Sequence, residues 1–272
     1  MLRVGCQTYP WKMGHHFGEI PHILDIARDA GFTSLEAEID MLGPWFNDPK
    51  AARDLFNEKH MSLSCLVLHQ DWEGCGQTKD EWELTRRALA FLREFPFAKL
   101  MVSHHAGGRQ RGEGAELEKR RENLMTCMNQ AAVEAAEYGI ITGFHPNSAA
   151  NSLFRTKEDY EVMFQMLSGT RIAWVPDVGH MENGGFSALE MMKAHREFIC
   201  HVHFKDRLRE NVWAVMGEGN IDYPTILKWL QEIGYKGWIM VEDESPKAAG
   251  NSDAVVRADG AYMMREIAAL EE

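Results

Sequence analysis

The chain has 272 residues, of which 45% are hydrophobic and 26% charged, the composition of a globular protein with a sizeable core. Its 29 basic and 41 acidic residues give a net charge of −12, which disfavours binding to nucleic acid phosphates and to anionic membranes. No apolar run reaches the roughly 20 residues that span a bilayer, and the first residues lack the basic and apolar segments of a signal peptide.

The five cysteines are an odd number and include no C-x-x-C pair. This pattern argues against a disulfide framework or a zinc knuckle and favours a reducing compartment. We therefore predict a cytoplasmic protein.

Short apolar runs typical of buried strands alternate with helical patterns along the whole chain. The predicted strands span residues 2–8, 33–39, 63–69, 99–105, 140–146, 172–180, 200–206 and 237–244. Helical periodicity between them is clearest at 19–31, 81–95 and 224–235, and a last helix is predicted at 254–270. The dipeptide Asp48-Pro49 predicts a helix start, and Gly31, Gly139 and Gly234 predict helix ends.

Eight strand–helix pairs in about 270 residues predict an α/β fold, a single (β/α)8 TIM barrel formed by residues 1–272 as one domain. A doubly wound open sheet is the alternative. That fold usually carries a glycine-rich phosphate loop after its first strand, and "GCQTYPW" is not such a loop. No linker of low complexity marks a second domain.

Polar residues gather where the predicted strands end. In chain order they are Glu36 and Glu38, His69, His104 and His105, His145, Asp177 with His180, His201 and His203, and Glu242 with Glu244. In a TIM barrel the carboxyl ends of the strands surround the active site, so these side chains are expected to converge on one cavity. Because side chains alternate along a strand, at most one of Glu36 and Glu38 is expected to point inward.

Imidazoles and carboxylates that converge from different strands suit Mn²⁺, Co²⁺, Fe²⁺ or Zn²⁺ better than Ca²⁺. A single histidine is more often structural or on the surface than a ligand. Asp177, His203 and Glu242, however, stand at three consecutive strand ends, and we predict a metal site there.

Four segments, "PDVGH", "HVHFKD", "GEGNIDYPTILKWL" and "GYKGWIMVE", resemble the sugar isomerase and epimerase family of xylose-isomerase-like TIM barrels in their order and spacing. That family includes ketose 3-epimerases, hydroxypyruvate isomerase, and inosose isomerase and dehydratase. The resemblance implies one divalent metal held after strands 5 to 8, and Asp177, His203 and Glu242 match its last three ligands. It also implies substrate contacts from His180 and Arg209.

The chain departs from the family at strand 5, where the usual glutamate position falls on His145 in "FHPN". A histidine can still ligate the metal, so His145 is expected to be the fourth ligand. Glu242 or His145 is the expected proton-abstracting group. Mn²⁺ is the expected ion, with Co²⁺, Fe²⁺, Zn²⁺ and Mg²⁺ left open.

The predicted function is therefore isomerisation or epimerisation of a small ketose, keto-sugar or keto-cyclitol, by proton abstraction next to a metal-bound carbonyl through an enediolate. Only one glutamate of the epimerase pair is kept, and "FHPN" partly resembles the inosose dehydratase branch. A metal-dependent dehydratase or lyase is accordingly the alternative.

Aromatic residues near strand ends are candidates for an apolar wall against a sugar ring: Tyr9, Trp11, Trp45 and Trp72. Of these, Trp11 is retained as a predicted substrate contact together with His69. Lys205 is expected to contact substrate, to support the residues that hold the metal, or to lie on the surface.

Two other functional classes are left as alternatives. Endonuclease IV shares the fold and "GEGNI", but it needs an Asp-x-His after strand 7, where this chain has Asn211 and Trp213. With the charge of −12, this argues against a nucleic acid partner. A non-catalytic sugar-binding barrel is the other class. The expected partner is a small-molecule sugar or cyclitol, without a membrane, and a homo-oligomer is left open.

Overall fold

The computed structural model describes residues 2–104, 109–208 and 212–270, which form two compact units. Unit 1 joins Met1–Cys65 to His201–Glu272, and unit 2 is the continuous segment Leu66–Cys200. Strand β3, Ser62–Gln70, starts in unit 1 and ends in unit 2. Unit 1 is therefore built from both ends of the sequence.

The strands of unit 1 are all parallel in its main sheet, and their order is β2-β1-β10-β7. Their bounds are β1 Arg3–Gln7, β2 Ser34–Glu38, β7 Val202–Phe204 and β10 Trp238–Val241. Nearly every residue in them is buried, as expected for parallel strands covered on both faces. The pairing of Cys6 with Val241 joins the first strand to the last, which is the connection that closes a (β/α)8 barrel.

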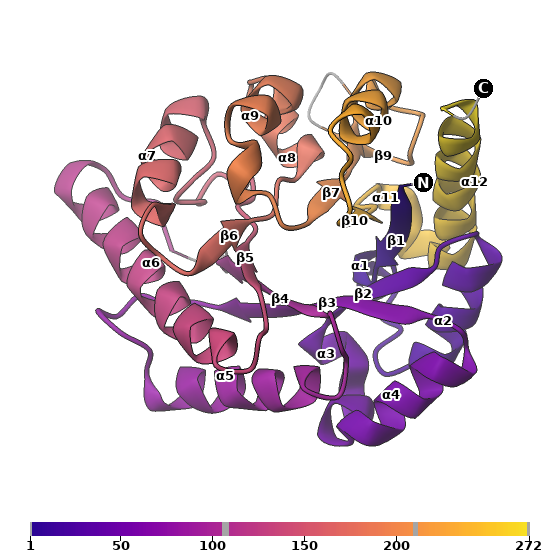
Figure 1. Ribbon diagram of the computed structural model, residues 1–272. Coiled ribbons are helices and arrows are strands. Elements are labelled where there is room, and N and C mark those ends of the chain that lie inside the picture. Colours follow the sequence, from indigo (N-terminus) through magenta and orange to yellow (C-terminus); the bar gives the residue numbers. More distant parts are fainter. Residues whose placement is uncertain (1, 105–108, 209–211, 271–272) are drawn as a thin grey trace. The chain divides into compact units, whose positions relative to one another are not determined.

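Helices α2 and α3 of unit 1 pack against β2, and α12 lies beside α2 (Figure 1). Their bounds are α1 Tyr9–Met13, α2 Ile20–Asp29, α3 Ile39–Leu42, α4 Pro49–Glu58, α10 Tyr223–Glu232, α11 Pro246–Gly250 and α12 Ser252–Ala269. A 3₁₀ turn covers Gly43–Asn47. After β7, the short strands β8 Asp206–Arg207 and β9 Trp213–Ala214 form an antiparallel pair.

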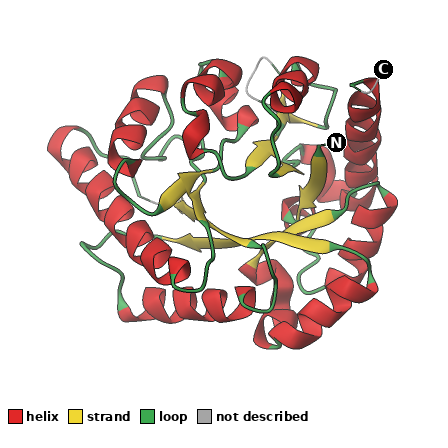
Figure 2. Cartoon of the chain, viewed as in Figure 1, coloured by secondary structure: helices red, strands yellow, loops and turns green. Residues whose placement is uncertain are grey.

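In unit 2 the strand order is β6-β5-β4-β3, again parallel where the pairing is described. The remaining strands are β4 Lys99–His104, β5 Thr142–Phe144 and β6 Ile172–Trp174. The helices are α5 Lys79–Leu92, α6 Gly114–Ala136, α7 Lys157–Leu167, α8 Val178–Asn183 and α9 Ala188–Ala194, with a 3₁₀ turn at Arg196–Phe198. Helix α5 packs on β4, and α6 packs on β4, β5 and β6 (Figure 2).

The predicted helix boundaries are confirmed where local chemistry determines them. The Asp48 side chain accepts a hydrogen bond from the Ala51 N–H at the start of α4. Gly31, Gly139 and Gly234 have φ values of 95°, 70° and 66°, the left-handed conformation in which glycine ends a helix. None of the helices among the described residues has the length and apolar content needed to cross a membrane.

Several predicted strands are shorter than expected, and polar residues explain two of these cases. The run 172–180 stops as a strand at Trp174, and Asp177 caps α8 by accepting the His180 N–H at 2.7 Å. The run 200–206 holds only Val202–Phe204 in the sheet, because Asp206 turns into the β8–β9 pair. In both cases a polar residue at the strand end has its own hydrogen-bonding role and ends the run.

Candidate functional site

The candidate site residues of unit 1 lie in the strands of its parallel sheet or directly beside them. Glu36 lies in β2, His203 in β7, and Glu242 directly follows β10. His201 precedes β7 and is two residues from His203, so both side chains point to the same face of the strand. All four side chains are buried.

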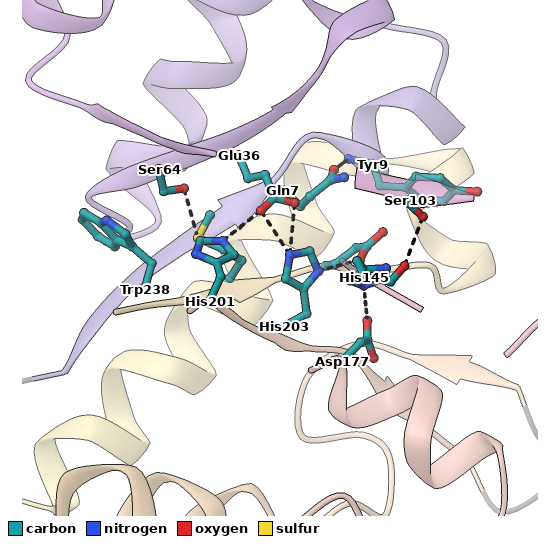
Figure 3. Close-up of polar contacts among 12 residues, drawn as sticks. Gln7, Tyr9, Glu36, Ser64, Ser103, His145, Asp177, His201, His203 and Trp238 are labelled. Atoms are coloured by element: carbon teal, nitrogen blue, oxygen red, sulfur yellow. Dashed lines mark hydrogen bonds and ion pairs between the residues drawn. The ribbon is translucent and has the colours of Figure 1, made fainter. Parts of the chain in front are cut away.

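These four side chains form one hydrogen-bonded cluster, of which Figure 3 shows Glu36 with both imidazoles. His201 Nε2 lies 2.9 Å from Glu36 Oε2, and His203 Nε2 lies 3.1 Å from both Glu36 oxygens. The other ring nitrogen of His203, Nδ1, lies 3.0 Å from Glu242 Oε2. The His203 ring therefore stands between two carboxylates.

Electrostatics follow from this packing. Burial raises the pKa of Glu36, but the positive charge of His203 and the hydrogen bonds from both imidazoles outweigh burial and lower the pKa to about 2. Burial lowers the pKa of His203, whereas Glu36 and Glu242 raise it to about 10. Glu36 is thus an anion, and His203 carries a proton on each nitrogen when no ion binds it.

Glu242 also has a buried cation beside it. Lys205 Nζ lies 3.3 Å from Glu242 Oε2 and 2.5 Å from Glu244 Oε1, and the Lys205 side chain is 1% exposed. The Tyr223 hydroxyl donates to the Lys205 carbonyl at 2.7 Å, and the ammonium lies 5.3 Å from the Trp213 ring centroid. The alternative that Lys205 is a surface residue is therefore wrong.

Glu36 and Glu38 differ from each other in partner, not in burial. Both are buried, with exposed fractions of 0% and 2%. Glu36 contacts the imidazoles, whereas Glu38 forms an ion pair with Lys12, which also lies 2.9 Å from Asp40. Glu38 is the last residue of β2 and the first turn of α3 follows it, so strict strand alternation no longer applies to its side chain.

The candidate residues of unit 2 form a second cluster. His145 follows β5, and its Nε2 lies 3.3 Å from Asp177 Oδ2, the contact drawn in Figure 3. The Ser103 hydroxyl donates to the His145 carbonyl at 3.2 Å, which ties the end of β5 to β4. The second Asp177 oxygen is occupied by the His180 N–H. One carboxylate therefore contacts both the His145 ring and the backbone of His180.

His180 is held in a defined tautomer by the loop after β5. The Ser148 backbone N–H lies 3.3 Å from His180 Nδ1, and the Ser148 hydroxyl lies 2.9 Å from the same nitrogen. Because a backbone N–H can only donate, Nδ1 is an acceptor and the ring proton is on Nε2. Asn183 Nδ2 donates to the Ser148 hydroxyl at 2.9 Å and completes the chain of hydrogen bonds. His180 can thus offer an N–H donor from Nε2.

The other predicted substrate contacts are located as follows. His69 lies in β3 and is exposed, and His104 ends β4 and is buried. Trp11 is 0% exposed in α1, and its indole N–H donates to Asp253 Oδ1 at 2.8 Å. This packing argues against Trp11 as a sugar contact, and we leave it out of the proposed site. Arg209, His105 and Asn211 lie outside the described residues.

The structure also places two further aromatic candidates, and it shows two residues near His180 that were not predicted. Trp72 is buried and Trp45 half-buried, and neither position defines a wall for a ligand. Ser148 and Asn183 were not predicted from the sequence. The only signal for Ser148 is its place three residues after His145 in "FHPNS", and Asn183 lies three residues after His180.

A sequence profile of the xylose isomerase-like TIM barrel family matches residues 24–267. The chain belongs to this family, so both the predicted resemblance and the predicted TIM-barrel fold are confirmed. The prediction that residues 1–272 form one domain stays a prediction.

Individual proteins that are similar to this chain share about a quarter of its residues over the matched region. The chain is 27% identical over 201 residues to the rhizopine catabolism protein MocC of Rhizobium meliloti, a match that covers 64% of this chain and 61% of that protein. It is 25% identical over 224 residues to inosose dehydratase of Geobacillus thermodenitrificans, covering 71% and 74% of the two chains.

Solved structures agree on the fold. The apo 3-keto-D-glucoside 4-epimerase YcjR of E. coli superposes with a TM-score of 0.76 at 17% identity, covering 97% of this chain and 99% of that one. The zinc-bound IOLI protein superposes with a TM-score of 0.77 at 14% identity, covering 99% of each chain. The names of these proteins fit both predicted reactions, epimerisation and dehydration.

Proposed function

We propose that this protein is a divalent-metal-dependent enzyme that removes a proton beside the carbonyl group of a small ketose, keto-sugar or keto-cyclitol. Isomerisation or epimerisation is the first outcome, and elimination of a hydroxyl or alkoxy group is the second. The observation that carries the proposal is the pairing of one imidazole nitrogen with one carboxylate oxygen in each unit, at the ends of strands.

The proposed ligands of one ion are His145, Asp177, His203 and Glu242. His203 Nδ1 lies 3.0 Å from Glu242 Oε2, and His145 Nε2 lies 3.3 Å from Asp177 Oδ2, so each pair would offer one nitrogen and one oxygen ligand side by side. That all four serve one ion is inferred from the family fold, in which strand carboxyl ends surround the active site.

When bound, the ion supplies Lewis-acid polarisation of a substrate carbonyl, which acidifies the neighbouring C–H bond. Mixed nitrogen and oxygen ligands suit Mn²⁺, Co²⁺, Fe²⁺ or Zn²⁺, and zinc is the ion bound by the IOLI protein. We propose Mn²⁺ as the native ion.

Glu242 is the proposed general base. Its Oε2 is hydrogen-bonded to His203 and lies 3.3 Å from the Lys205 ammonium, two contacts that hold the carboxylate in a fixed orientation. His180 is the proposed substrate contact that donates from Nε2 to a hydroxyl or carbonyl oxygen, since its Nδ1 is occupied by Ser148. Arg209 and His69 remain proposed substrate contacts on sequence grounds.

His145 is the reason that elimination is the alternative reaction. An epimerase of this type needs acid–base groups on both faces of the substrate, and this chain has an imidazole where the second carboxylate is expected. The similarity to inosose dehydratases supports the same alternative. The product, not the proton-removal step, distinguishes the two reactions.

The other partners follow from charge and composition. The net charge of −12 supports a small-molecule partner and not a nucleic acid. The odd number of cysteines and the lack of a C-x-x-C pair in the sequence support a reducing, cytoplasmic location.

The test is NMR in D₂O with metal-loaded protein and a panel of ketoses, inososes and 3-keto-glycosides. We expect deuterium to enter beside the carbonyl of at least one substrate, with loss of the signal after chelation and in Glu242→Gln. Metal-loaded protein that exchanges no proton in any of the three classes would contradict the proposal. A product with an added double bond would identify elimination.

A further inference from the structure

Glu36 is a buried carboxylate that contacts two imidazoles and is not among the proposed ligands. Its side chain is 0% exposed, and its contacts come from His201 at 2.9 Å and His203 at 3.1 Å. In the sheet order β2-β1-β10-β7, two strands separate Glu36 from the histidines. Its side chain therefore reaches them across the inner face of the curved sheet in unit 1.

Only one nitrogen of His203 can bind an ion, and the geometry indicates which one. Nε2 faces Glu36, whose Oε2 is already shared with His201, in surroundings with no exposed surface. Nδ1 faces Glu242, a proposed ligand with a side chain that is 7% exposed. Nδ1 is thus the nitrogen on the side of the proposed ligands.

We infer that Glu36 is a positioning residue for the metal centre. Its carboxylate accepts the Nε2–H of His203, which fixes the ring and leaves Nδ1 to coordinate the ion. His201 donates a second hydrogen bond to Glu36 and holds the carboxylate in place. This inference rests on the proposed function, because it takes His203 as a ligand.

The proposed arrangement is a carboxylate–histidine–metal triad. A carboxylate on the far nitrogen of a ligating imidazole fixes its tautomer and raises its basicity, and loss of such a partner typically weakens metal binding about 10- to 100-fold. A competing arrangement uses Glu36, His201 and His203 as ligands themselves, since one ligand atom from each lies within 4.8 Å of the others. That arrangement requires Nε2 of His203 on the ion.

The first experiment compares Glu36→Gln with Glu38→Gln by titration of the intact protein with Mn²⁺ and Zn²⁺. Glu38 is the matched control, because it is an equally buried glutamate of the same strand that pairs with Lys12 instead of an imidazole. We expect a 10- to 100-fold rise in the metal dissociation constant for Glu36→Gln and less than threefold for Glu38→Gln. Equal affinities for folded Glu36→Gln and wild type would overturn the inference.

The second experiment needs no variant of Glu36 and so stands even if that variant fails to fold. In ¹⁵N-histidine-labelled, Zn²⁺-loaded wild type, the His203 signals are assigned by their loss in His203→Gln. We expect the shift of a metal-bound nitrogen at Nδ1 and of a protonated nitrogen at Nε2. Zinc on Nε2 would refute the inference and favour the competing arrangement. A wild type that binds neither ion would refute the proposed function itself.

Discussion

Replacement of Lys205 by methionine should destabilise the protein strongly, because it removes the positive charge beside two carboxylates. Methionine keeps most of the side-chain volume, so the change tests charge more than packing. The Lys205 side chain is 1% exposed, and its partners Glu242 and Glu244 are 7% and 20% exposed. Breaking a buried ion pair from one side typically costs about 3–5 kcal/mol.

We expect the lower end of that range, about 3 kcal/mol, because Glu244 retains partial contact with water. With an unfolding entropy of roughly 2.1 cal/mol/K per residue, 3 kcal/mol corresponds to a fall of about 5 °C in the melting temperature of a chain of this length. The measurement is calorimetry on chelated protein, since a bound ion would itself stabilise the folded state.

Two further variants make the reasoning refutable. Lys193→Met removes an exposed lysine that lies 3.1 Å from Glu190, and it should change stability by less than about 0.5 kcal/mol. The double variant Lys205→Met/Glu244→Gln should recover part of the loss, because one stranded carboxylate becomes neutral. A loss below about 1 kcal/mol in Lys205→Met, or no recovery in the double variant, would show that the ion pair is not the source of the stability.

Four other outcomes can be checked. Ser148→Ala removes the hydroxyl bonded to His180 but keeps the backbone N–H, so steady-state kinetics should show a higher KM with little change in kcat. His145→Glu should retain the metal by elemental analysis, and its product profile should keep epimerisation but lose elimination; loss of the metal would show that His145 is not at the family's ligand position. Burial, and then the charge of Asp243, raise the pKa of Asp259, so the contribution of Asp259 to stability is expected to fall as pH rises above about 4, and Asp259→Asn should stabilise the protein more at pH 8 than at pH 5 in urea titrations. Duplex DNA should not be retained at physiological salt, and salt-sensitive binding in a mobility assay would contradict that expectation.

Residues whose roles follow from strand position could be predicted from the sequence. His203 and Glu242 lie at strand ends that apolar runs and family motifs define, and the structure of unit 1 pairs them. Asp177 was expected in a strand but caps a helix, because a capping hydrogen bond to a residue three positions on competes locally with continued extension.

Other roles depend on contacts between segments far apart in the sequence. Glu36 and Glu38 look equivalent in the sequence, yet Glu36 contacts imidazoles 165 and 167 residues away and Glu38 contacts a lysine 26 residues away. Ser148 acts on His180 only because the loop after β5 reaches α8, a contact that neither segment signals by itself. Trp11 follows a strand as a substrate-contacting aromatic would, but a partner near the other end of the chain, Asp253, holds it in the packing.

The pairing of β1 with β10 has a consequence for synthesis on the ribosome. The side of β1 that pairs with β10 cannot form its hydrogen bonds until Trp238, the partner of Arg3, has been synthesised. Unit 2, by contrast, is continuous in the chain. At about 5–20 residues per second, the delay is on the order of 12 to 47 s. During that time the backbone of β1 presents an open edge, which is a template for pairing with other nascent chains. Low temperature slows translation and lengthens this delay. We therefore expect soluble yield to depend more on chaperones that shield the open strand edge than on the stability of the folded protein.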